Sequence, residues 1–198
     1  MKRIYSKCLM VPVILALLLT GCAEEKRPAI EKRAKDSSLQ ETADLSYLTS
    51  KEVSSQIVFE GQDMEGNEIS STVFSQSKLT MINVWATYCN PCLSEMPGLG
   101  QLAAEYAPGE FQIIGIISDV PEGDNEENIN LAAELIEQTG ADYTHLLLNE
   151  SIFYALLTDV TAVPTTFFID QNGVIVDTVV GAMEKSAWED RINGILEE

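Results

Sequence analysis

The chain has 198 residues, 45% of them hydrophobic and 22% charged, which is a globular composition and indicates one domain with appendages. Its 31 acidic residues outnumber its 12 lysines and arginines and give a net charge of −19. A surface this negative is poorly suited to the phosphate backbone of nucleic acids, so we expect no nucleic-acid partner. A soluble acidic surface is the simplest reading, and a preference for basic partner proteins is the weaker alternative.

Residues 1–21 have the pattern of an export signal. Three cationic residues precede an apolar run at 9–19, which is too short to span a membrane as a mature helix. The run ends in Leu-Thr-Gly-Cys at 19–22, which resembles the lipobox of bacterial lipoproteins. That resemblance implies that Cys22 is lipidated and becomes the mature N-terminus. An ordinary signal peptide with a chance cysteine is the alternative.

Residues 22–54 are rich in Glu, Lys, Ala and Ser and contain few large apolar side chains. Such a segment cannot bury enough surface to fold alone, so we expect a flexible tether that holds the following domain away from a membrane. The domain itself is predicted at residues 55–198. A length of about 140 residues is enough to bury a core.

The body begins with a predicted β-hairpin within 57–71, where a turn-rich stretch separates two apolar segments. An apolar strand at 79–85 runs into Trp-Ala-Thr-Tyr-Cys-Asn-Pro-Cys at 85–92. A helical pattern follows at 90–107, and Pro97 inside it should kink the helix. The sequence therefore predicts a strand that leads directly into a helix whose first turn carries two cysteines.

Cys89 and Cys92 are two residues apart at this helix start. A thiol there faces unsatisfied backbone N–H groups and the positive end of the helix dipole, which favour the reactive thiolate. Cys89 is the expected attacking thiol, and Cys92 can close a disulfide with it. Pro91 stiffens the turn where no backbone donor is needed. Two alternatives remain at this point: half of a zinc site, with His145 as the only histidine, or two inert core thiols.

The rest of the chain alternates between strand and helix patterns. Strands are predicted at 111–120, 144–148, 163–170 and 174–180, and helices at 128–139, 152–157 and 186–196, the last N-capped by Ser186. A turn signal at 171–173 joins the last two strands. This order predicts an α/β fold with a central sheet and helices on both faces.

The order of elements, together with four motifs, resembles the thioredoxin fold. More closely, it is similar to the membrane-tethered thiol–disulfide oxidoreductases of the TlpA/ResA type. The motifs are Asn-Val-Trp-Ala-Thr at 83–87 with the cysteine pair, Glu-Met-Pro at 95–97, Ala-Val-Pro-Thr-Thr-Phe at 162–167, and Asp-Gln-Asn-Gly at 170–173. The resemblance implies a thioredoxin-like fold with a central mixed β-sheet and an N-terminal β-hairpin extension.

The resemblance also implies which residues form the site. Pro164 is expected in the cis conformation, with its loop against the sulfurs and the backbone of Val163 pairing with a substrate strand. An ordinary trans proline at a strand start is the alternative. Catalytic roles are predicted for Cys89, Cys92, Pro164 and Asp119, and substrate contacts for Trp85, Tyr88, Pro91, Val163 and Thr165.

Two positions depart from the family patterns. Tyr88 stands where Trp often precedes the active cysteine, although it can still shield the sulfur. Asn83 stands where thioredoxin carries a buried Asp and cannot accept a proton, although Asn is common in the TlpA/ResA branch. Some relatives place a buried acid after the next strand, so Asp119 is the candidate proton acceptor for Cys92, and Glu122 is the second. A loop or capping role for Asp119 is the alternative.

Two further residues have simpler interpretations. Glu95 lies one helical turn beyond Cys92 and either orients a lysine or the substrate, or belongs to a solvated face. His145 is expected at the surface or packed on a strand rather than as a ligand.

The predicted reaction is thiol–disulfide exchange without a metal or organic cofactor, with reduction of protein disulfides favoured over oxidation. The family suggests apocytochrome c before haem attachment as a substrate. The expected partners are a protein disulfide or dithiol, a membrane electron donor, and the membrane itself through lipid on Cys22. We expect a monomer outside the cytoplasm, on the outer face of a bacterial membrane. The alternatives are a non-catalytic metal- or partner-binding module of the same fold, or a peroxiredoxin-like peroxidase.

Overall fold

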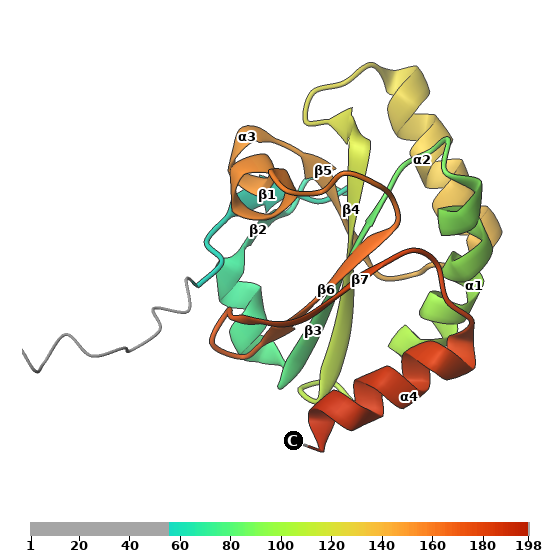
Figure 1. The fold of residues 1–198 in the computed structure, drawn as a ribbon. Coiled ribbons are helices and arrows are strands. Elements are labelled where there is room, and N and C mark those ends of the chain that lie inside the picture. The colour runs from blue at the N-terminus through green and yellow to red at the C-terminus, as the bar shows by residue number, and fades with distance from the viewer. Residues whose placement is uncertain (1–55, 198) are drawn as a thin grey trace, which may run out of the picture. The chain divides into compact units, whose positions relative to one another are not determined.

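The computed structural model describes residues 56–197 (Figure 1). The predicted export signal at 1–21, the lipidation site Cys22 and the tether at 22–54 lie outside the described residues and stay predictions. Within 56–197, the structure contains no helix that is both long and apolar enough to cross a membrane.

A five-stranded mixed sheet forms the centre of the domain. Its strands lie in the order β5 (Thr144–Leu148), β4 (Phe111–Pro121), β3 (Leu79–Trp85), β6 (Thr165–Asp170) and β7 (Ile175–Val180). Strands β3, β4 and β5 are parallel, whereas β6 runs antiparallel to β3 and β7 runs antiparallel to β6. Every residue of the central strand β3 is buried, as its apolar sequence predicts. The predicted central mixed sheet is therefore confirmed.

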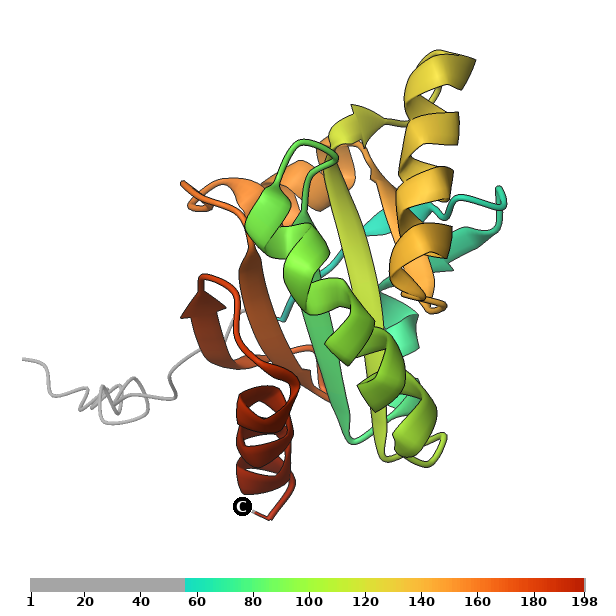
Figure 2. The same cartoon turned by 90° about the vertical axis from the view of Figure 1, so that its right-hand side faces the viewer.

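The two faces of the sheet carry different elements (Figures 1 and 2). One face is covered by the helices α1 (Asn90–Glu105), α2 (Glu126–Thr139) and α4 (Lys185–Leu196). The other carries the hairpin of β1 (Glu60–Gln62) and β2 (Glu68–Ser70), the 3₁₀-helix η2 (Ser71–Gln76), the short helix α3 (Glu150–Ile152) and the π-helical turn η3 (Phe153–Leu157). The structure confirms the predicted N-terminal hairpin and the helices on both faces.

Alternate residues of β3 point into different parts of the core. Ile82 and Val84 lie in the cluster beneath the hairpin and η3, whereas Met81 lies in the cluster shared with α4. Trp85, the last residue of the strand, is fully buried in a third cluster that also contains both cysteines. The end of the central strand therefore places the cysteine loop where α1 and α2 pack against the sheet.

Three helix starts differ from the sequence-based predictions. Helix α3 begins at Glu150, two residues before the helix predicted at 152–157. Helix α2 begins two residues earlier than predicted, because Asn125 is its N-cap and accepts a hydrogen bond from the Asn128 N–H (3.0 Å). Helix α4 is preceded by Glu184 as its cap residue, which makes no side-chain capping hydrogen bond. Ser186 therefore lies in the first turn of α4, and its predicted N-cap role is wrong.

His145 on β5 reaches across β4 to the end of β3. Its Nδ1 accepts a hydrogen bond from Trp85 Nε1 (3.1 Å), and its Nε2 donates to the carbonyl oxygen of Ala141 (2.9 Å). Burial lowers the pKa of His145 to about 4, so the ring is neutral at neutral pH. Gly115 is its register partner on β4, where a Cβ would come within 2.2 Å of Nδ1. The predicted strand-packing interpretation of His145 is confirmed.

Replacing Gly115 by alanine is expected to lower the free energy of unfolding by about 1–3 kcal/mol, because the His145 ring must move off its contact with Trp85. Urea denaturation measures the change. Gly194→Ala on α4 is the control, since nothing lies within 4 Å of a Cβ at that position. Alanine there should be neutral or stabilise by up to about 1 kcal/mol. Equal effects of the two substitutions would contradict this account of Gly115.

Candidate active site

The two cysteines lie at the start of α1 and form a disulfide, with their Cα atoms 5.3 Å apart. Cys89 is the N-cap residue of the helix, and its Sγ accepts a hydrogen bond from the Cys92 N–H (3.2 Å). Pro91 lies in the first turn, where the helix needs no N–H donor. Cys89 is 5% exposed and Cys92 is fully buried, which agrees with Cys89 as the expected attacking thiol. The helix terminus therefore stabilises negative charge on the sulfur of Cys89.

A second loop brings a backbone carbonyl oxygen to the same sulfur. The Val163–Pro164 peptide bond is cis, as the resemblance implied. The carbonyl oxygen of Val163 lies 3.5 Å from Cys89 Sγ. Thr165 then starts β6, and its hydroxyl donates to the carbonyl oxygen of Ala162 (2.7 Å), which closes the loop on itself. Of the predicted site residues, Cys89, Cys92, Val163 and Pro164 therefore meet at one place.

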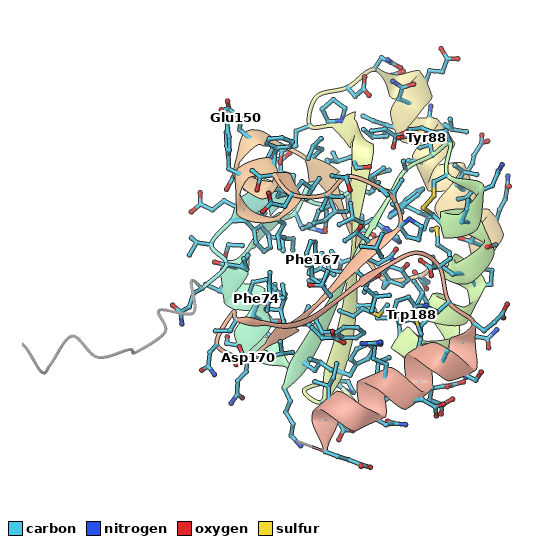
Figure 3. All side chains as sticks on the ribbon, viewed as in Figure 1. Phe74, Tyr88, Glu150, Phe167, Asp170 and Trp188 are labelled. Carbon is cyan, nitrogen blue, oxygen red and sulfur yellow. A yellow bond between two sulfur atoms is a disulfide. The ribbon has the colours of Figure 1, made fainter. Side chains whose placement is uncertain are left out.

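Some of the residues predicted to contact substrate are exposed, and others are buried. Tyr88 is 73% exposed and lies beside the disulfide at the start of α1 (Figure 3). Pro91 is also exposed, and Val163 is partly exposed. Trp85 and Thr165 are buried with their polar atoms hydrogen-bonded inside the protein, so the predicted contacts of these two side chains with substrate are wrong.

A surface groove of 250 Å³ adjoins Tyr88 and the cis-proline loop. It is lined by Tyr88, Ser118, Leu148, Phe153, Leu157 and residues 160–163. Phe153, from the π-helical turn η3, is 42% exposed. Apolar and aromatic side chains dominate this lining, which suits the apolar side chain of a peptide bound beside Cys89.

Asp119 is hydrogen-bonded to the loop that precedes the cysteines. Its carboxylate accepts hydrogen bonds from the Thr87 N–H (3.0 Å) and from the Thr87 hydroxyl (2.6 Å). Glu122, the second candidate, accepts from the Gln62 N–H (2.9 Å) and the Asn149 amide (2.7 Å). Both carboxylates therefore have structural partners in neighbouring loops, and the loop-holding alternative for Asp119 is the one that the structure supports.

The acid beneath the dithiol is Glu95, which is 5% exposed. Its Oε1 accepts from Asn83 Nδ2 (3.0 Å), and its Oε2 accepts from the Met183 N–H (3.0 Å) and Trp188 Nε1 (3.2 Å). Burial raises the pKa of Glu95, and these three hydrogen bonds oppose the shift. Because Glu95 follows Cys92 by three residues on α1, both side chains share one face of the helix. The solvated-face interpretation of Glu95 is therefore wrong.

The model of the AhpC/TSA family matches residues 54–178. The chain belongs to the AhpC/TSA family.

Curated relatives of this chain include a thioredoxin-like protein and a thiol-disulfide oxidoreductase. The chain is 30% identical over 126 residues to the thioredoxin-like protein YneN of Bacillus subtilis, which covers 64% of this chain and 70% of the relative. It is 30% identical over 124 residues to the thiol-disulfide oxidoreductase ResA of Oceanobacillus iheyensis, covering 61% and 58% of the two chains. The oxidoreductase described here is thus a TlpA/ResA-like member of the thioredoxin family.

A solved structure agrees in fold. The exposed lipoprotein thioredoxin Etrx1 of Streptococcus pneumoniae is 26% identical, with a TM-score of 0.53 over 69% of this chain and 98% of that one. Together with the Cys89–Cys92 pair, these relatives identify the protein as a thiol–disulfide oxidoreductase.

The role of Glu95 was accessible to sequence reasoning through helical spacing. The buried face of α1 carries Cys92, Glu95, Met96, Leu99 and Leu102. A carboxylate in the middle of such an apolar face must find partners or a shifted pKa, which is a sign of a functional group. The sequence-based choice of Asp119 instead followed the position of an acid in some relatives.

In this oxidoreductase, ionised Glu95 should cost stability. Because its folded pKa lies above the unfolded value, its contribution is fully present below about pH 4.5 and is lost as the pH rises through the folded pKa. In the oxidised protein, Glu95→Gln is therefore expected to gain free energy of unfolding relative to the wild type between pH 4.5 and 8, measured by urea denaturation. The exposed Glu134→Gln on α2 is the control and should show no such trend. A gap between Glu95→Gln and the wild type that does not change with pH would refute the assignment.

Proposed function

We propose that this oxidoreductase reduces disulfide bonds of substrate proteins, with Cys89 as the attacking and Cys92 as the resolving thiol. The observation that carries the proposal is the position of Cys89 Sγ at the N-terminus of α1 and against the carbonyl oxygen of Val163. A thiolate at a helix N-terminus is the nucleophile that disulfide exchange requires.

The reaction has two exchange steps. The Cys89 thiolate attacks one sulfur of the substrate disulfide, forms a mixed disulfide and releases the other substrate sulfur as a thiolate. Cys92 then loses its proton, attacks Cys89 Sγ, and releases the second substrate sulfur as the Cys89–Cys92 bond forms. The protein leaves the cycle oxidised, and an electron donor must return two electrons and two protons to it.

Glu95 is the proposed acceptor for the proton of Cys92. Both residues lie on the buried face of α1, and the raised pKa of Glu95 brings it closer to that of a thiol than an exposed carboxyl would be. Glu95 also lines a 390 Å³ pocket with Met183, Glu184 and Lys185, on the side of α1 towards α4. That pocket gives the carboxyl a route to solvent that a substrate at Cys89 would leave open.

The substrate is proposed to lie across the cis-proline loop. Val163 would pair with an extended substrate segment through its backbone, Pro164 would hold that loop, and Tyr88 with the adjoining groove would receive an apolar side chain. Pro91 is exposed in the first turn of α1 and would contact the same segment. A protein in its extended or unfolded state fits this arrangement better than a compact surface does.

Charge favours the reducing direction. Strong oxidants of this fold owe their high potential to a stabilised reduced form. The sequence from 79 to 184 contains no lysine or arginine, so no cation of this stretch is available to stabilise a thiolate. The buried carboxyl of Glu95 disfavours a second negative charge on its neighbour Cys92. The dithiol is therefore expected to give up its electrons readily.

The proposed place of action is outside the cytoplasm, with lipid on Cys22 as the membrane anchor and residues 22–54 as the tether. The lipobox resemblance supports this, as does the similarity to a pneumococcal structure described as an exposed lipoprotein thioredoxin. A membrane donor would then supply the electrons. Apocytochrome c before haem attachment is the substrate that the TlpA/ResA resemblance suggests, and the domain is expected to act as a monomer.

Insulin reduction by the domain with dithiothreitol as electron source tests the function. The wild type is expected to accelerate precipitation of the insulin B chain, whereas Cys89→Ser should lose this activity because no attacking thiol remains. Cys92→Ser should instead accumulate a mixed disulfide between Cys89 and the substrate, visible on a non-reducing gel. Equal activity of the wild type and Cys89→Ser would sink the proposal, and rapid consumption of hydrogen peroxide without insulin reduction would favour a peroxidase.

A further inference from the structure

The side-chain amide of Asn83 is bonded at one end only. It is fully buried on β3, and its Nδ2 donates to Glu95 Oε1 (3.0 Å) and to Thr166 Oγ1 (3.1 Å). Its Oδ1 is buried and has no hydrogen-bond partner within residues 56–197. Buried polar atoms are nearly always paired, so an orphaned acceptor beside a titrating carboxyl calls for a physical reason.

The two oxygens of Glu95 are not equivalent. Oε2 accepts from the Met183 N–H and from Trp188 Nε1, and both of these groups can only donate. A proton on Oε2 would face two donors. Oε1 faces only the amide of Asn83, whose other end carries an unused acceptor. The proton of a neutral Glu95 is therefore best placed on Oε1, provided that Asn83 presents its oxygen there.

We propose that the amide of Asn83 turns over when Glu95 takes up a proton, so that Oδ1 then accepts from the carboxyl O–H and from the hydroxyl of Thr166. The hydroxyl of Thr166 suits both states, because it accepts from Nδ2 now and can donate to Oδ1 after the turn. Asn83 is thus a positioning residue, which keeps Glu95 hydrogen-bonded in both of its protonation states.

The proposal rests on the function proposed above, in which Glu95 accepts the proton of Cys92. In that step the Cys89–Cys92 bond forms, the bond from Cys89 to the substrate breaks, and the substrate thiolate takes a proton from solvent. The proton of Cys92 resides on Oε1 until Glu95 releases it to solvent. Asn83 turns once when the proton arrives and once when it leaves.

Other groups around Glu95 come from α1, α4, β3, β6 and the segment before β5. Cys92 precedes it on α1, and Glu184 and Lys185 line the pocket that it shares with the start of α4. Lys185 is paired with Glu105 (2.7 Å). On the β5 side, burial and then the charge of Glu95 raise the pKa of Tyr143, so its phenol stays neutral. Asn83 on β3 and Thr166 on β6 do not titrate, so they can follow the proton without adding charge.

Nuclear magnetic resonance of the oxidised protein tests the turnover directly. At a pH where Glu95 is ionised, the amide protons of Asn83 should show cross-peaks to the side chain of Thr166. These cross-peaks should fade as Glu95 is protonated, because Nδ2 moves to the other side. In Glu95→Gln, whose Nε2 can only donate to Asn83, the turned amide is expected at every pH. Cross-peaks that persist in the protonated wild type, or in Glu95→Gln, would overturn the proposal.

The pH profile of insulin reduction supplies a functional readout. Asn83→Leu should move the acid limb up by about one pH unit, which is about tenfold in rate on that limb, because the carboxylate loses its amide partner in apolar surroundings. Thr80→Val also removes a buried polar group from β3, and it should leave the profile in place. If the pH at which the rate falls on the acid side is the same in Asn83→Leu as in the wild type, Asn83 has only a structural role.

The two proposals can fail separately. If the amide turns over with the protonation of Glu95 but Glu95→Gln keeps the wild-type pH profile, Glu95 is not the acceptor and the turnover still stands. If the rate of Glu95→Gln no longer falls at low pH as that of the wild type does, but the Asn83 amide never turns, the proposed function stands and the turnover is refuted.

Discussion

The structure depends on a carboxylate that is buried where carboxylates are costly. Glu95 lies on the apolar face of α1, and it is tolerated because β3, the loop before α4 and α4 itself each supply a donor through Asn83, Met183 and Trp188. These hydrogen bonds tie the helix that carries the cysteines to the centre and one edge of the domain. The same burial raises the pKa of Glu95, so one packing constraint serves both the fold and the proton chemistry of the dithiol.

The dithiol is built from opposing electrostatic effects. The N-terminus of α1 favours a thiolate on Cys89, since the Cys92 N–H already points at its sulfur. Glu95 disfavours charge on Cys92. The sequence from 79 to 184 contains no lysine or arginine, and Lys185, which lines the pocket at Glu95, is paired with Glu105. The two cysteines are only three positions apart, but we propose different roles for them: Cys89 attacks the substrate, and Cys92 keeps its proton until Glu95 accepts it.

Local patterns predicted most of the fold. The bounds of β3 and β5, the helix that starts at Asn90 and the cis peptide bond at Pro164 all agree with the sequence-based expectations, because each rests on a local pattern or on a motif specific to the family. Apart from helix ends and the solvated-face interpretation of Glu95, the failures concern contacts between distant segments. Asp119 accepts a hydrogen bond from Thr87, and buried Trp85 donates one to His145. Both contacts join segments that are far apart in the sequence. No local spacing could reveal those pairings, whereas the burial of Glu95 was readable from the helical period.

The central claim is that the Cys89–Cys92 couple is a reductant. Its reduced form is disfavoured by the buried carboxyl of Glu95 and by the absence of lysine and arginine in the sequence around the cysteines. The most direct test is the equilibrium reduction potential of this couple, measured against glutathione at pH 7. The account predicts a value near about −270 mV or lower, typical of reductants of this fold. A value near about −120 mV would mark a strong oxidant and would contradict it.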